Sequence, residues 1–203
     1  LALTKQGQDG PARNAMRQLK RDWKTVQIAL RKTVPGDASW TDTLANVQQS
    51  IDKASTQVNR GELAEAHETL EAIRDAFLDL RTASDVPYEL DALNRFHATM
   101  EKIVKPASSM KPTDLDAETR QQFEQLARQA RQTWSEMDAA KFDQRRFQLT
   151  YAQVRQLEPM IEAERQALEA LSDALKKGDS ALILDAAKAI KPGFAKVYMF
   201  FGD

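Results

Sequence analysis

One pattern occurs twice in this sequence, as Gly61-Glu-Leu-Ala-Glu-Ala-His-Glu-Thr-Leu-Glu-Ala-Ile-Arg-Asp-Ala-Phe77 and as Gly178-Asp-Ser-Ala-Leu-Ile-Leu-Asp-Ala-Ala-Lys-Ala-Ile-Lys-Pro-Gly-Phe194. Five positions are identical, and other positions keep the sign of their charge, among them Glu62 with Asp179 and Arg74 with Lys191. A repeated helix start, a repeated Ala-Ile-basic step and a repeated Phe predict that one helical unit was duplicated.

Apolar residues outside this pattern also recur every three or four positions, the spacing of one face of an α-helix. Seven such stripes cover residues 12–30, 40–58, 63–80, 90–103, 123–137, 154–175 and 180–190. The turn and cap residues between them predict helix starts at Ser39, with Asp42 as capping-box partner, and at Thr113. Pro106 is expected to end the fourth helix, and Pro192-Gly193 the seventh.

No segment shows the alternation of a β-strand, and the connections between stripes are short. We therefore predict an all-α protein, an antiparallel helical bundle of about seven helices with an internal duplication of a three-helix unit. Residues 1–105 are expected to hold the first helical repeat plus a bridging helix, and residues 113–203 the second repeat. The two parts either share one continuous core or abut.

The composition narrows the class of protein. The chain has 203 residues, 29 basic and 30 acidic, and a net charge of -1, so no overall field attracts nucleic acid or an anionic membrane. It has no cysteine, which excludes disulfides and thiolate metal sites. No apolar run approaches the ~18 residues that span a bilayer, so we expect a soluble protein without a transmembrane segment. The first residue is Leu and not Met, which either a removed secretory signal or a trimmed sequence would explain; we favour the first and therefore expect a periplasmic or secreted location.

Glu164 is an anomaly within its stripe. With the two copies aligned at their glycines, it takes the place of Val47, between Ile161 and Leu168. A buried, unpaired carboxylate would cost several kcal/mol or take up a proton. We favour a stripe-edge position or a core ion pair with an arginine such as Arg74 over a ligand role.

The two histidines share a local context, since each stands four residues before a glutamate: His67 before Glu71, and His97 before Glu101. That spacing places both side chains on one side of a helix. In a packed core, His97 would hydrogen-bond Glu71 or another carboxylate. As a functional site, His97, Met100 and Glu101, joined by Glu71 or Glu164, would bind a metal, and His with Met suits copper or haem.

This His/Met combination within an all-helical bundle is similar to the b-type bundle cytochromes, in fold class and residue type. The resemblance implies a haem held without covalent attachment. Motifs typical of other chemistry are missing from the sequence: the Glu-x-x-His of di-iron bundles, His-Glu-x-x-His, Gly-x-Ser-x-Gly and a glycine-rich phosphate loop. We therefore predict that the protein is not an enzyme.

Two functions follow from these observations. The first is a non-enzymatic helical binding or interaction protein of the bacterial cell envelope, acting through helix surfaces and the apolar segment Phe194–Phe201, with a protein partner or a second copy in a homodimer. The alternative is a metal- or haem-binding bundle for carriage, sensing or electron transfer that uses His97 and Met100. The sequence does not identify a cofactor.

Overall fold

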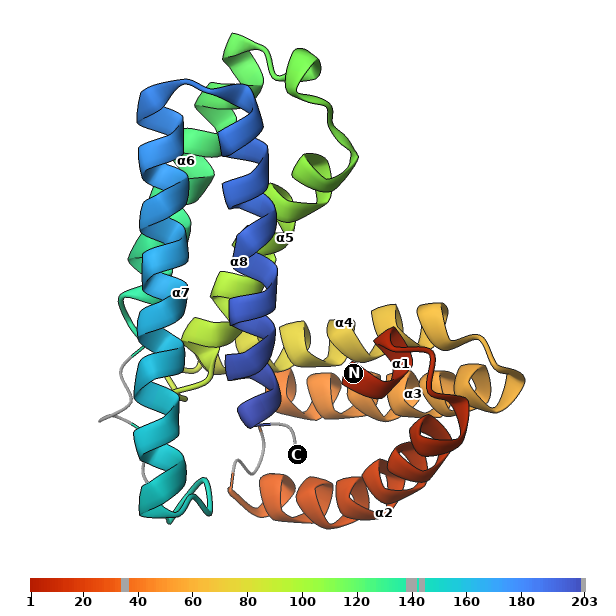
Figure 1. Ribbon diagram of the computed structural model, residues 1–203. Helices are drawn as coiled ribbons and strands as arrows, with labels where there is room; N and C mark the ends of the chain where they lie inside the picture. Colours follow the sequence, from red (N-terminus) through yellow and green to blue (C-terminus); the bar gives the residue numbers. More distant parts are fainter. Residues whose placement is uncertain (34–36, 138–141, 143–144, 202–203) are drawn as a thin grey trace. The chain divides into compact units, whose positions relative to one another are not determined.

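The computed structural model describes residues 1–33, 37–137, 142 and 145–201, and these residues form helices and connections but no strand. The helices are α1 (Ala2–Lys5), α2 (Asp9–Thr33), α3 (Ala38–Arg60), α4 (Leu63–Ala83), α5 (Asp91–Ser109), a 3₁₀ turn η1 (Pro112–Asp114), α6 (Ala117–Trp134), α7 (Tyr151–Lys177) and α8 (Ser180–Phe200) (Figure 1). The all-α prediction is confirmed, and the described part holds eight α-helices where about seven were expected. None of these helices is long and apolar enough to cross a membrane.

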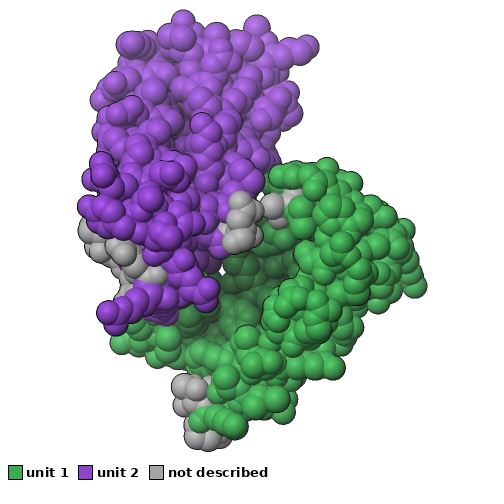
Figure 2. Space-filling model, turned by 60° about the horizontal axis from the view of Figure 1, so that its bottom comes forward, with its two compact units in different colours: residues 1–88 green, residues 89–203 purple. Residues whose placement is uncertain are grey.

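The chain divides into two compact units, unit 1 with residues 1–88 and unit 2 with residues 89–203 (Figure 2). Unit 1 contains α1 to α4, and unit 2 contains α5 to α8 with the 3₁₀ turn. The helix expected to bridge the two repeats is α5, and it packs against α6 and α8 within unit 2.

In unit 1, α3 lies between its neighbours, since both α2 and α4 pack against it, while short α1 touches α2 and α4. This position explains why the predicted stripe of α3 is buried along its whole length: Trp40, Leu44, Val47, Ile51, Ala54 and Val58. The stripe of α2 is covered only in part. Ala12, Met16 and Trp23 are buried, whereas Leu19 is 37% and Val26 is 44% exposed.

Unit 2 is a four-helix bundle in which α5 packs on α6, α6 on α7, α7 on α8 and α8 on α5 (Figure 1). Its centre contains Phe96, whose ring centroid lies 4.6 Å from that of Trp134 and 5.7 Å from that of Phe194. The indole N–H of Trp134 donates to the carbonyl of Ile161 at 3.0 Å, which satisfies the one polar atom of this buried side chain.

The two copies of the repeated pattern begin at glycines with nearly the same backbone conformation. Gly61 has φ 78° and ψ 10°, and Gly178 has φ 77° and ψ 9°. Each ends one long helix and leads within two residues into the next, because the left-handed conformation is open to glycine at little cost. These turns agree with a duplication but do not confirm it, and the duplication stays a prediction.

Several predicted helix boundaries are wrong. Pro106 lies inside α5 and Pro192 lies inside α8. A proline removes one backbone hydrogen bond from a helix, and the burial of Ala107, Phe194 and Val197 beyond the two prolines offsets that loss. The caps also differ, since Asp37 and Asp116 accept from the amides of Trp40 and Thr119, the roles expected of Ser39 and Thr113.

The apolar C-terminal segment closes the core of unit 2. Phe194 and Val197 are buried, and Phe201 packs against Phe142 and Phe147 with ring centroids 4.8 Å and 5.7 Å away. Tyr198 and Phe200 are partly buried against the same core. This segment therefore has a packing role within unit 2.

Candidate functional site

His97 is a buried side chain of α5, 7% exposed, and it packs against aromatic rings of α8. Its ring stacks on that of Phe194 at 5.1 Å and on that of Tyr198 at 6.4 Å. Its Nε2 lies 3.8 Å from Oε1 of Glu101, the partner that the spacing predicted. These contacts stabilise the α5–α8 interface of unit 2.

The carboxylate of Glu101 is paired with two lysine side chains. Its Oε1 accepts from Nζ of Lys191 at 2.8 Å, and its Oε2 lies 3.5 Å from Nζ of Lys105. Met100 is 1% exposed in the core of unit 2. A carboxylate paired with two ammonium groups is less available to a metal ion.

Glu71 lies in unit 1, on α4, and its carboxylate is 3.4 Å from Nε2 of His67 and 3.7 Å from Nη1 of Arg74. His67 also approaches the hydroxyl of Thr4, at 3.3 Å from Nδ1. The structure thus pairs Glu71 with residues of its own unit, whereas the predicted partner His97 belongs to unit 2.

Glu164 is fully buried in unit 2, so the expected position at a stripe edge is wrong. Its two carboxyl oxygens have no hydrogen-bond partner among the described residues, and Arg74 of unit 1 pairs with Glu71 and Asp75 instead. The side chain lies against Gly193 of α8, where an added Cβ would come within 2.0 Å of Oε2. The missing side chain of Gly193 leaves the space that the carboxyl group occupies.

The pKa of Glu164 reflects this environment. Burial raises it from 4.5 to about 8, and the nearby backbone amide of Phe194 lowers it by a smaller amount. A carboxyl group with this pKa is neutral at pH 7, which avoids most of the cost of a buried charge.

Of the predicted metal ligands, His97, Met100 and Glu101 lie on α5 and Glu164 on α7 of unit 2, and Glu71 lies on α4 of unit 1. Among the described residues, no group of three or more His, Cys, Asp or Glu side chains could hold a metal ion together. The metal or haem site stays a prediction from the sequence.

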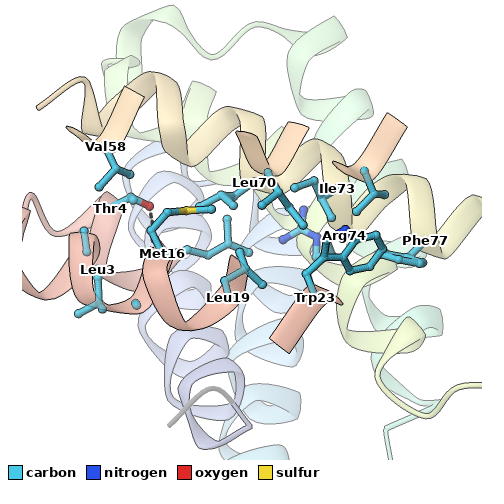
Figure 3. Close-up of a pocket in the computed structure, with 15 residues that line it drawn as sticks. Leu3, Thr4, Met16, Leu19, Trp23, Val58, Leu70, Ile73, Arg74 and Phe77 are labelled. Atoms are coloured by element: carbon cyan, nitrogen blue, oxygen red, sulfur yellow. Dashed lines mark hydrogen bonds between the residues drawn. The ribbon is translucent and has the colours of Figure 1, made fainter. Parts of the chain in front are cut away.

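The structure contains a different site, an apolar pocket of about 380 Å³ within unit 1 (Figure 3). Pockets of 300–1,000 Å³ with mainly apolar walls are typical of small-molecule sites. All four helices of the unit contribute to its lining: Leu1, Leu3 and Thr4 of the α1 segment, Ala12, Ala15, Met16, Leu19 and Trp23 of α2, Val47, Ile51 and Val58 of α3, and Leu70, Ile73, Arg74 and Phe77 of α4.

The pocket exists because α2 and α4 both pack on α3 but have little direct contact with each other. The space between the two helices extends along α2 from Ala12 to Trp23, a length of about 16 Å at ~1.5 Å per residue. Trp23 and Phe77 close one end, with an edge-to-face contact at 6.0 Å between ring centroids. Figure 3 shows Leu3, Thr4 and Val58 at the opposite end, with Met16 and Leu70 between the two ends.

This pocket was not predicted from the sequence, although the long apolar stripe of α2 indicates it. That six-residue stripe is as long as that of α3, yet among the described helices α3 is the one long helix that packs closely against α2. Part of the stripe therefore has to face a pocket or solvent, and Met16, Leu19 and Trp23 line the pocket.

No protein-family model matches this sequence, and no curated protein or solved structure matches it. The functional assignment therefore depends on the chemistry of the site itself. What the pocket offers is an elongated apolar surface with one charged side chain, Arg74, among the described residues that line it.

Proposed function

We propose that this chain is a non-enzymatic binding protein whose unit 1 takes a small, elongated apolar molecule into the pocket between α2 and α4. The observation that carries the proposal is the pocket itself: about 380 Å³, lined by apolar side chains of all four helices of the unit. Apolar surface that stays wet in the empty protein favours a ligand by roughly 25 cal/mol per Å² when covered.

The lining suits an adaptable binding site. Met16 and Leu19 have flexible side chains, and thioethers adjust readily to ligands of different shape. Trp23 is held in place, because its Nε1 donates to Oε1 of Gln48 at 2.9 Å. A fixed aromatic ring at one end of a row of adaptable aliphatic side chains fits an alkyl chain or a narrow aromatic molecule.

The neutral fluorescent probe N-phenyl-1-naphthylamine tests this proposal. We expect its emission to rise on titration with the protein and to saturate at one probe per chain. Ala15 is an exposed residue at the pocket wall, so Ala15→Trp should obstruct the pocket and weaken probe binding at least about fivefold, with the helical content unchanged.

Ala170→Trp is the matched control, because Ala170 is an exposed alanine of α7 in unit 2. It should bind the probe as the unchanged protein does. Absence of saturable probe binding, or equal loss in both variants, would contradict the proposal.

The other parts of the functional prediction stay predictions from the sequence: the cell-envelope location, a protein partner, a homodimer and the metal or haem alternative. The alternative is decided by metal analysis and an absorption spectrum of protein purified without a histidine tag. Bound copper, iron or a Soret band that disappears in His97→Ala would support it.

A further inference from the structure

Arg74 lies at the same end of the pocket as Trp23 and Phe77 (Figure 3). It carries the one charged side chain among the described residues of the lining, and that side chain is only 13% exposed. The hydroxyl of Thr4, the other polar side chain of the lining, donates a hydrogen bond to the carbonyl of Leu1 at 2.7 Å. A polar group on a bound ligand would therefore be met by Arg74.

The guanidinium of Arg74 keeps hydrogen-bonding capacity in this position. Of its five N–H donors, those on Nε and Nη2 point to the same oxygen, Oδ1 of Asp75, at 3.2 Å and 3.1 Å. Nη1 lies 3.7 Å from Oε1 of Glu71, which is too long for a hydrogen bond. Nη1 thus makes no hydrogen bond to a described residue, although the side chain is mostly buried.

The carboxylates of Asp75 and Glu71 compete with a ligand for the guanidinium of Arg74, and neither holds it in a strong, exclusive ion pair. Asp75 is 58% exposed, and an ion pair in such contact with water contributes little. Glu71 is shared between Arg74 and His67. A ligand that offered two oxygens in one plane would match the guanidinium better than either residue does, since bidentate pairing requires that geometry.

We infer that the ligands of this pocket are monocarboxylate amphiphiles, with an elongated apolar body along Met16 and Leu70 and a carboxylate that accepts hydrogen bonds from Arg74. This inference rests on the proposed function, because it names the class of molecule that the same pocket takes.

Three competitors of equal length separate the possible head groups: decanoate, decan-1-ol and decylammonium. Each is titrated against the protein loaded with N-phenyl-1-naphthylamine, below the concentration at which it forms micelles. We expect decanoate to displace the probe at a concentration at least about tenfold lower than decan-1-ol, because a hydrogen bond to a charged group contributes more than one between neutral groups. Decylammonium should be the weakest.

Arg74→Met removes the charge and keeps the length of the side chain. In this variant decanoate should lose its advantage over decan-1-ol, with both competitors compared against the probe affinity measured for the same variant. Arg60→Met is the matched control, since Arg60 is an exposed arginine of the same unit that lies outside the pocket lining, and it should keep the original order.

The inference is overturned if decanoate is no better than decan-1-ol in the unchanged protein. It is also overturned if decylammonium is strongest, which would mean that Glu71 and Asp75 determine the preference. Both results leave the proposed function standing as long as the probe binds; a probe that does not bind contradicts the proposed function instead. If Arg74→Met fails to fold, the ranking in the unchanged protein still decides.

Discussion

Glu164 holds its carboxyl group in the interior of unit 2, where no described residue offers it a hydrogen bond. The unfolded chain releases the proton near the ordinary pKa of 4.5, whereas the folded unit keeps it up to a pKa of about 8. The contribution of Glu164 to the free energy of unfolding is therefore fully present below about pH 4.5, and it is lost as the pH rises to about 8. Unit 2 should be more stable in mild acid than in mild base.

Glu164→Gln tests this directly, because an amide has nearly the same shape and no charge to lose. Between pH 5 and pH 8 the free energy of unfolding should fall more in the unchanged protein than in the variant, by roughly 3–5 kcal/mol. Urea unfolding of both proteins at several pH values measures the difference. Parallel pH profiles would show that Glu164 keeps an ordinary pKa.

Gly193 is predicted to be a glycine that even alanine cannot replace without cost. An added Cβ at this position would meet the carboxyl group of Glu164, whereas one at Gly10, in the first turn of α2, would meet nothing within 4 Å. We expect Gly193→Ala to destabilise the protein by about 1–3 kcal/mol and Gly10→Ala to be neutral or slightly stabilising, as measured by urea unfolding. In a Glu164→Ala background the cost of Gly193→Ala should shrink, and an unchanged cost would mean that the two residues do not compete for space.

The anomaly at Glu164 was visible in the sequence, because a carboxylate interrupts an otherwise apolar stripe. The protonated state of Glu164 could not be predicted from the sequence. That state depends on which side chains surround it in the folded unit, and the expected partner Arg74 lies in the other unit. Spacing along one helix carries no information about such long-range neighbours.

The starts of α4 and α8 show how two copies of one pattern can differ in their energetics. Asp179 caps α8, accepting from the amides of Ala181 and Leu182 at 2.9 Å and 3.1 Å. Its counterpart Glu62 makes no side-chain cap bond at the start of α4. Glutamate is one methylene longer than the residues that cap well.

We therefore predict that Asp179→Ala costs about 1 kcal/mol of unfolding free energy and that Glu62→Ala costs nearly nothing. Thermal or urea unfolding of the two variants, each compared with the unchanged protein, provides the measurement. Equal losses would show that the charge near the helix dipole, which both residues supply, matters more than the cap bond.

The spacing of apolar residues predicted the helices better than the prolines predicted the helix ends. All six stripe residues expected in α3 are buried, because a helix with neighbours on two sides covers its whole apolar face. Pro106 and Pro192 misled the prediction of helix ends, since packing beyond each proline keeps the helix going. A local rule fails where tertiary contacts outweigh one lost hydrogen bond.

At the scale of the whole molecule, the fold class followed from the sequence and the pocket did not. An all-α chain needs only helical periodicity, which is a local property. The pocket depends on α2 and α4 sharing α3 as a neighbour while having little direct contact with each other, and the apolar stripes do not show which helices pack together. The division into units is equally invisible in the apolar stripes: Glu71 lies in unit 1 and His97 in unit 2.

The division into units gives a prediction about ligand effects. Because the pocket lies within unit 1, a bound ligand should slow amide hydrogen exchange in α2, α3 and α4 and leave α5 to α8 unchanged. At a free ligand concentration of about ten times Kd, the stabilisation of unit 1 should be about 1.4 kcal/mol. Hydrogen exchange with and without decanoate measures both effects, and Ala15→Trp should show neither. Slower exchange throughout unit 2 would place the ligand elsewhere.

Trp23 forms the aromatic end of the pocket and is fixed there by its bond to Gln48. An indole at the wall of a binding site senses the polarity around it, so the arrival of a ligand that drives out water should move its emission to shorter wavelength. Unit 1 thus carries an intrinsic optical reporter of occupancy. With Trp40 and Trp134 replaced by phenylalanine, unlabelled protein would be enough to screen whole libraries of candidate molecules.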